Sequence, residues 1–294
     1  LPSGPSAILR TKTPAPVLLV DDDRWYQMES YYREALEARD IPYDVWSTRH
    51  QESGPPGAYS PYTDTLRHYP IVLWFTGYDW YEPIRDEEKT RLLTYLDEGG
   101  RLLLSSLEFL YQHSDDPLAC RFGVLSYNEV LNPTQASGVP DHPAGGSWGP
   151  VKLFYPYQNW ADAIEPRPEA APIVRGRKGQ PLAIAAGSTV SLAASCNISL
   201  TDHTWRTLFY GFPIETLPLD TRAEALERAV GWLSPLGQSR WTITPTVLAA
   251  APGYPTIAQP SARVTATLIL RNDADDPVSA VVSHTLPSFL TLIA

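Results

Sequence analysis

Three short apolar runs, each followed by polar residues, limit what this chain can fold into more than any other feature. The runs span residues 17–20, 71–75 and 101–104. Runs of this length, separated by helical patterns, are typical of strands that are buried on both faces of a parallel sheet. In such sheets ligands bind at the carboxyl ends of the strands. The runs therefore predict both the core of the fold and the edge at which a site would lie.

The segments between these runs have helical periodicity. From 25 to 39 apolar residues recur on one helical face, and Asp23 is the expected N-cap. A second helix is expected from 85 to 98, ended by Gly99 and Gly100. We therefore expect an α/β fold with a three-layer, doubly wound, mainly parallel sheet. Further strands are expected at 43–46, 151–155, 182–185, 190–194 and 208–212, and a capping box at Thr221 predicts a helix through Leu233.

The composition of the sequence changes twice along the chain, and these changes predict three parts. Residues 1–15 are rich in Pro, Ser, Gly and Thr and are typical of a linker. Residues 16–237 hold the strand and helix patterns of the α/β domain. Residues 238–294 alternate β-branched and polar residues, which predicts part of an all-β, sandwich-like (Ig-like) domain. Because that part is short for a whole sandwich, we expect the chain to be a piece of a longer protein.

Composition argues against two functional classes. The net charge of -10 at pH 7 is unfavourable for a nucleic-acid partner, which needs basic patches. No apolar run approaches the roughly 18 residues that a membrane span requires. The chain has 29 prolines and 1 methionine, and arginine supplies most of its positive charge. This bias is typical of a GC-rich or thermophilic bacterial source.

The two cysteines, Cys120 and Cys196, leave two alternatives open. They form one disulfide if the protein is secreted, or they are two buried thiols. Neither lies in a C-x-x-C or other metal-binding spacing, so a zinc site is not expected.

Polar and aromatic side chains follow the buried runs, where a site would lie. The three aspartates after the first run would bind Mg²⁺ or Ca²⁺, or would instead cap a helix, pair with an arginine and face solvent. The aromatic pair after the second run would stack on sugar rings, or pack within the protein. No cofactor is expected apart from such a divalent cation. The ligand-binding candidates are Asp21, Asp22, Asp23, Thr76, Asp79, Trp80 and Tyr81.

Six segments carry a resemblance to a known superfamily. They are residues 17–23, 31–36, 43–46, 74–78, 93–104 and 210–215. Over residues 16–233 the chain resembles the class I glutamine amidotransferase-like superfamily, and especially its non-catalytic branch in large secreted bacterial proteins. The resemblance implies a flavodoxin-like core, an extracellular or cell-surface location and neighbouring domains in a longer chain. The stretches 264–272 and 285–287 look like a β-sandwich repeat of bacterial surface proteins.

The chain departs from the catalytic branch of that superfamily at the decisive position. A working amidotransferase has a nucleophilic cysteine in a tight strand-to-helix turn, with a histidine later in the chain. Here Ser105 and Ser106 follow the third run instead. The alternative to a silent domain is a hydrolase in which these serines act with His113 or His203.

The sequence favours a domain without catalytic residues over an enzyme. We expect a scaffold or binding module of a secreted or cell-surface bacterial protein. Its expected partners are neighbouring domains and a polysaccharide or protein ligand. The alternative is a hydrolase that uses Asp21, Asp22 and Asp23 with Ser105 and Ser106 at the edge of the sheet.

Overall fold

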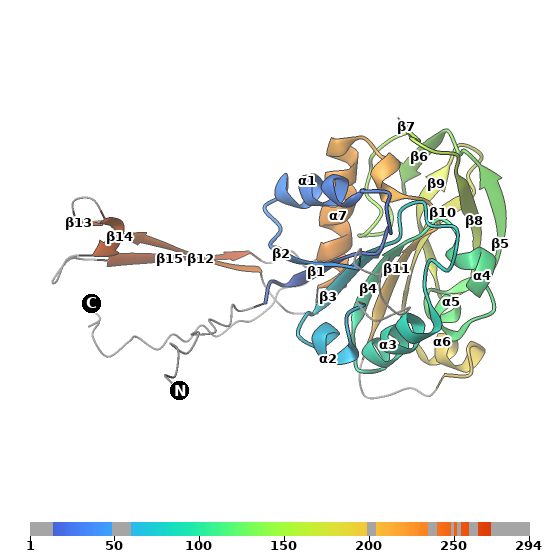
Figure 1. The fold of residues 1–294 in the computed structure, drawn as a ribbon, viewed down its shortest axis with the longest axis horizontal. Helices are drawn as coiled ribbons and strands as arrows, with labels where there is room; N and C mark the ends of the chain where they lie inside the picture. Colours follow the sequence, from blue (N-terminus) through green and yellow to red (C-terminus); the bar gives the residue numbers. More distant parts are fainter. Residues whose placement is uncertain are drawn as a thin grey trace, which may run out of the picture. The chain divides into compact units, whose positions relative to one another are not determined.

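A computed structural model gives the fold of the chain (Figure 1). The chain divides into two compact units, Leu1–Ser234 and Pro235–Ala294, and each is described by itself. The structure describes whole residues over 14–48, 60–198 and 204–234, and the backbone alone over 240–247, 250–251, 254–258 and 264–271.

A nine-stranded mixed sheet forms the centre of the first unit, with the strand order β2-β1-β3-β4-β11-β10-β9-β6-β7. The five strands from β2 to β11 are parallel, and in chain order they run 2-1-3-4-5, which is the flavodoxin-like order. The parallel strands are β1 (Val17–Asp21), β2 (Tyr43–Ser47), β3 (Ile71–Phe75), β4 (Arg101–Ser105) and β11 (Arg206–Tyr210). The antiparallel strands are β10 (Pro181–Gly187), β9 (Ala171–Gly176), β6 (Gln135–Gly138) and β7 (Val151–Lys152). These findings confirm the α/β class.

Helices cover both faces of the sheet (Figure 1). Side chains of β1 alternate between two cores: Val17 and Leu19 join one, and Leu18 and Val20 join the other. Burial on both faces is the reason why the run is apolar throughout. The first core includes α1 (Glu29–Glu37) and α7 (Leu219–Leu233). The second includes α2 (Thr63–Leu66), α3 (Asp86–Asp97), α4 (Phe109–His113), α5 (Pro117–Arg121) and α6 (Val190–Ser195).

Several predicted elements differ from the observed ones. The strand expected at 190–194 is the helix α6, because Thr189 caps it by accepting a hydrogen bond from the N–H of Leu192 (3.2 Å). The helix expected from residue 25 begins at Glu29. The helix α7 begins at Leu219, two residues before the predicted capping box.

Three further elements, a pair of strands and a 3₁₀ helix, complete the first unit. The strands β5 (Val124–Leu131) and β8 (Trp160–Pro166) form a separate antiparallel pair. A 3₁₀ helix, η2 (Ile214–Thr216), follows β11. None of the described helices is long and apolar enough to cross a membrane.

The second unit is described by its backbone alone. The strand β12 (Arg240–Val247) pairs antiparallel with β15 (Val264–Arg271), and β13 (Ala250–Ala251) pairs with β14 (Tyr254–Ala258). A sandwich-like domain stays a prediction. The motif expected at 285–287 and most of the expected linker lie outside the described residues.

Candidate functional site

The carboxyl ends of four central strands lie level with one another. Asp21 of β1 is in register with Phe75 of β3, Phe75 with Ser105 of β4, and Ser105 with Tyr210 of β11. The residues that follow these strands therefore meet at one edge of the sheet. We call this edge the rim.

Asp22 takes part in the packing of the rim. Its carboxylate accepts hydrogen bonds from Thr48 Oγ1 (2.6 Å) and Trp74 Nε1 (3.0 Å). Burial raises the pKa of Asp22 well above its ordinary value, and the nearby Glu88 raises it further. Because each oxygen already accepts a bond from a buried side chain, we assign Asp22 a structural role.

Asp21 and Asp23 lie close to a third carboxylate that the sequence analysis missed, that of Glu29 in α1. One carboxylate oxygen from each of the three lies within 4.8 Å of the others. Asp23 accepts a hydrogen bond from the N–H of Met28, and all three residues have further interactions within the protein. A divalent cation here stays a prediction, and its ligands would include Glu29 in place of Asp22.

The two candidate nucleophiles are buried and hydrogen-bonded. Ser105 Oγ lies within hydrogen-bonding distance of Tyr32 Oη (3.0 Å) and accepts a hydrogen bond from the N–H of Ile214 (3.2 Å). Ser106 Oγ is bonded to Thr76 Oγ1 at 2.9 Å. These bonds link the ends of β3, β4 and β11 to α1. Thr76 and both serines therefore hold the rim together.

The candidate histidine bases are not bonded to these serines within the described residues. His113 lies at the end of α4, where its Nδ1 contacts the carboxylate of Asp116. Its Nε2 is 2.8 Å from the carbonyl oxygen of Ile84. His203 lies outside the described residues. Among the described residues, neither serine therefore has a histidine placed as its general base.

A buried polar set around Glu215 lies under the rim. Tyr32 Oη donates a hydrogen bond to Glu215 Oε2 (2.7 Å). Burial raises the pKa of Glu215 to about 7, and the charge of Asp23 also raises it. Among the described residues, Glu215 Oε1 has no hydrogen-bond partner, and the Asn159 side chain interacts with the Tyr78 hydroxyl. Polar groups of this kind are the hydrogen-bonding partners that an ordered, buried water molecule requires.

A second acidic pair, Glu108 and Asp162, was also missed as a pair. Glu108 follows β4, and the N–H of Asp162 in β8 donates to the carbonyl oxygen of Gly211 (2.6 Å) after β11. Burial raises the pKa of Glu108 to about 7, and Glu129 raises it further. Burial also raises the pKa of Asp162 well above its ordinary value, with further contributions from Glu108 and Glu129. Within the described part of the chain, neither carboxyl has a hydrogen bond or an ion pair.

An exposed group at the rim, Arg24, Trp25, Trp80 and Tyr81, is called the aromatic platform below. The three rings are 55%, 62% and 55% exposed. The guanidinium of Arg24 lies 5.7 Å from the Trp25 ring centroid and 5.3 Å from that of Tyr81. The Trp80 and Tyr81 rings meet edge to face at 6.1 Å. The second alternative given for Trp80 and Tyr81, packing within the protein, is therefore not what the structure shows.

Asp79 fixes the position of the aromatic platform through two hydrogen bonds. Its Oδ2 accepts a hydrogen bond from Arg24 Nε (2.6 Å), and its Oδ1 accepts one from the N–H of Tyr81 (3.0 Å). Burial raises the pKa of Asp79 to about 6, whereas Arg24 and the Tyr81 bond lower it. Asp79 is therefore a positioning residue for the exposed rings.

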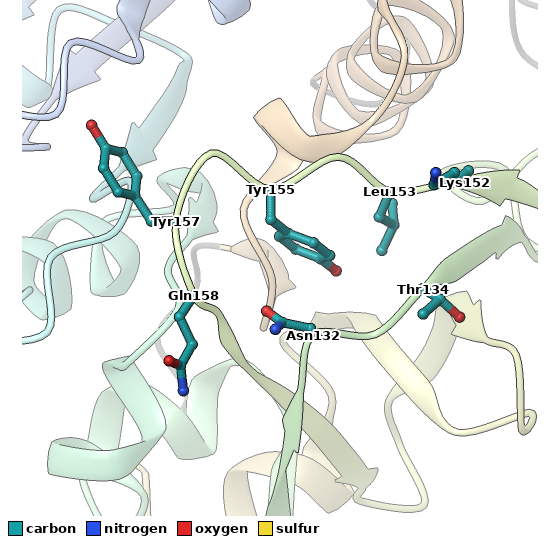
Figure 2. Close-up of a pocket in the computed structure, with 7 residues that line it drawn as sticks. All are labelled: Asn132, Thr134, Lys152, Leu153, Tyr155, Tyr157 and Gln158. Carbon is teal, nitrogen blue, oxygen red and sulfur yellow. The ribbon is translucent and has the colours of Figure 1, made fainter.

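An open pocket of about 490 Å³ lies beside the rim (Figure 2). Figure 2 shows Tyr155 and Asn132 facing one another across it, while Tyr157 and Gln158 point away. The pocket is not evident from the sequence, because its walls come from two separate segments of the chain. Its lining residues are Asn132, Thr134, Lys152, Leu153, Tyr155, Tyr157 and Gln158.

Cys120 and Cys196 form a disulfide in the structure, with 5.8 Å between their Cα atoms. It joins the end of α5 to the residue that follows α6. We expect a thiol-reactive reagent to detect no free thiol in protein that is unfolded without reductant, and two after reduction. Two free thiols before reduction would contradict the disulfide and its support for an oxidising compartment.

Comparison with known proteins reveals structural likeness without sequence kinship. No family model matches the chain, and no curated protein matches it. The mmIFT52 N-terminal domain is 14% identical with a TM-score of 0.47, covering 74% of this chain and 97% of that one. A ThuA-like protein from Parabacteroides merdae ATCC 43184 is 13% identical with a TM-score of 0.43, covering 75% and 90%.

Proposed function

We propose that this chain is a non-catalytic binding module of a secreted or cell-surface protein, and that it binds a polysaccharide on the aromatic platform. The observation that carries the proposal is the exposure of Trp25, Trp80 and Tyr81 around one fixed arginine. Single exposed apolar residues are ordinary, whereas a contiguous group of large rings marks a binding surface. Flat rings at a fixed spacing match the apolar faces of sugar rings.

The backbone beneath the aromatic platform supports this proposal. Arg24, Gln27 and Glu82 have φ angles of 57°, 61° and 52°. Non-glycine residues in this left-handed region carry a conformational penalty, and such residues cluster at functional sites. All three lie in the loops that bear the exposed rings.

The same geometry disfavours the hydrolase alternative. A serine hydroxyl needs a positioned base to act as a nucleophile at neutral pH. Ser105 and Ser106 instead bond to Tyr32 and Thr76 in the interior. We therefore place the ligand on the exposed surface of the rim and not beneath it.

The wider parts of the proposal rest on separate observations. The flavodoxin-like order of the parallel strands, and Ser105 where a cysteine nucleophile would be, support a non-catalytic relative of the glutamine amidotransferase-like superfamily. The disulfide supports an extracellular or cell-surface location. Neighbouring domains of a longer chain are proposed as further partners.

Binding to insoluble cellulose, chitin and xylan tests the proposal. We expect the protein to sediment with at least one of them. Trp80→Ala and Tyr81→Ala should each weaken binding about tenfold, since a ring at the centre of an interface contributes roughly 1–2 kcal/mol. Tyr62→Ala is the matched control, because Tyr62 is 56% exposed and its ring lies 4.4 Å from the guanidinium carbon of Arg91, which is not part of the aromatic platform. Absence of binding to all three polymers, or an equal loss in the control, would contradict the proposal.

A further inference from the structure

We infer that the pocket beside the rim is a second subsite for the same polysaccharide, where one neutral sugar unit is recognised through its hydroxyl groups. This inference rests on the proposed function and adds the class of sugar and the residues that select it. The aromatic platform would supply affinity, and the pocket would supply selectivity.

A row of rings joins the pocket to the aromatic platform. The backbone of Tyr157 borders the pocket, while its side chain turns away from it (Figure 2). The Tyr157 ring lies 5.3 Å from that of Tyr26, which lies 5.8 Å from that of Trp25. From Trp25 the row continues through Arg24 to Tyr81. A linear glycan lying along this row would reach both sites.

The lining of the pocket fits a neutral sugar better than an ion. None of its seven residues is acidic, so it lacks the carboxylates that a hard cation prefers. It holds one cation, Lys152, and no arginine, which is a weak set for phosphate or sulfate. The chain's net charge of -10 also repels polyanions. Amides and hydroxyls, which both donate and accept hydrogen bonds, match sugar hydroxyls.

Asn132 is held in a fixed position at the wall of the pocket. Its N–H donates to the carbonyl oxygen of Asn159 (2.8 Å), and its Oδ1 accepts from the N–H of Asn159 (2.9 Å). Its φ of 43° is in the left-handed region, which asparagine tolerates well. With Oδ1 engaged, the side-chain NH₂ is the group that Asn132 presents to a ligand. A preorganised donor of this kind selects among hydroxyl orientations.

Tyr155 places a hydrogen-bond acceptor at a fixed position on the opposite wall of the pocket. Its hydroxyl donates a hydrogen bond to the carbonyl oxygen of Pro133. The lone pairs of that hydroxyl therefore remain as an acceptor for a sugar hydroxyl. Donor and acceptor thus face one another across the pocket (Figure 2).

Two variants remove the proposed contacts, and the second of them, Tyr155→Phe, also removes the hydrogen bond to the Pro133 carbonyl oxygen. Asn132→Asp keeps the oxygen that accepts from Asn159 and loses the NH₂ donor, while Tyr155→Phe keeps the ring and loses the hydroxyl. Asn128→Asp is the control, because it makes the same charge change on the exposed face of β5. Unchanged thermal unfolding would verify that each variant is folded.

Calorimetric titration with neutral oligosaccharides of two to six units, cut from the polymer that binds best, tests the inference. We expect affinity to rise with length, and both pocket variants to lose about fivefold or more with the longest ligands while the control binds normally. If the pocket variants bind every length as the unmodified protein does, yet Tyr81→Ala fails to bind, the subsite is wrong and the proposed function stands. If the unmodified protein binds no oligosaccharide or polymer, the proposed function itself fails.

Discussion

Replacing Arg222 with alanine should lower the free energy of unfolding of the α/β unit by about 3 kcal/mol. The Arg222 guanidinium is buried. Its Nε donates to the carbonyl oxygen of Tyr31 (2.9 Å), and its Nη1 donates to those of Leu217 (2.7 Å) and Glu215 (3.3 Å). One side chain of α7 thus satisfies acceptors from α1 and from the segment around η2. Alanine would leave the carbonyls of Glu215 and Leu217 without this donor and open a cavity.

The matched control for this prediction lies in the same helix. Arg228 pairs with Glu224 one turn away at 2.8 Å in a partly exposed position, so Arg228→Ala should change stability by less than about 0.5 kcal/mol. Arg222→Lys should fall between the two, because an ammonium cannot reach three carbonyls in the fork geometry of a guanidinium. Urea unfolding followed by tryptophan fluorescence measures all three. Equal losses for Arg222→Ala and Arg228→Ala would show that the buried network contributes little.

The sequence predicted the centre of the fold because burial there is symmetrical. The runs at 71–75 and 101–104 coincide with β3 and the first four residues of β4, whose side chains are all buried. Strands covered on both faces need apolar residues at every position, so local pattern and tertiary environment agree. The segment 190–194 shows the opposite case. Its Val190 suits a strand, whereas its Leu and Ala residues are strong helix formers and the hydroxyl of Thr189 caps the helix.

The site was harder to predict because neighbouring aspartates meet different surroundings. Asp22 bonds to two buried side chains, whereas Asp23 accepts from the backbone of Met28. Nothing in a run of three identical residues separates these roles. Only tertiary contacts, with residues 26 and 52 positions away for Asp22, make the distinction.

The pairings between distant segments also escape sequence reasoning. Glu108 follows β4, and Asp162 lies on β8, beyond a long insertion. The turn at Gly211 brings Asp162 to the same rim, with a backbone bond of 2.6 Å. A carboxylate that reads as a solvated charge in the sequence is thus one half of a buried acidic pair.

The buried carboxyls give the protein an unusual expected response to pH. Stability should fall by up to about 5 kcal/mol between pH 5 and pH 8 at constant ionic strength. Burial raises the pKa of both Glu108 and Glu215 from 4.5 to about 7. A carboxyl with a raised pKa binds its proton more tightly in the folded chain. The protonated carboxyl therefore contributes fully to the free energy of unfolding below the pKa that it has in the unfolded chain. This contribution is lost as the pH rises through the folded-state pKa of about 7.

Substitution at the acidic pair separates this local effect from the repulsion expected of a net charge of -10. Asp162→Asn with Glu108→Gln should raise the free energy of unfolding at pH 8 by about 1–2 kcal/mol and leave it little changed at pH 5. Glu165→Gln is the control, because Glu165 is an exposed carboxylate on the same strand. Urea unfolding at both pH values, repeated at high salt, measures the change, since salt screens long-range repulsion far more than a buried pair. If the double variant keeps the full loss of stability between pH 5 and pH 8, the buried pair is not its source, and Glu215 or the acidic surface as a whole would have to be.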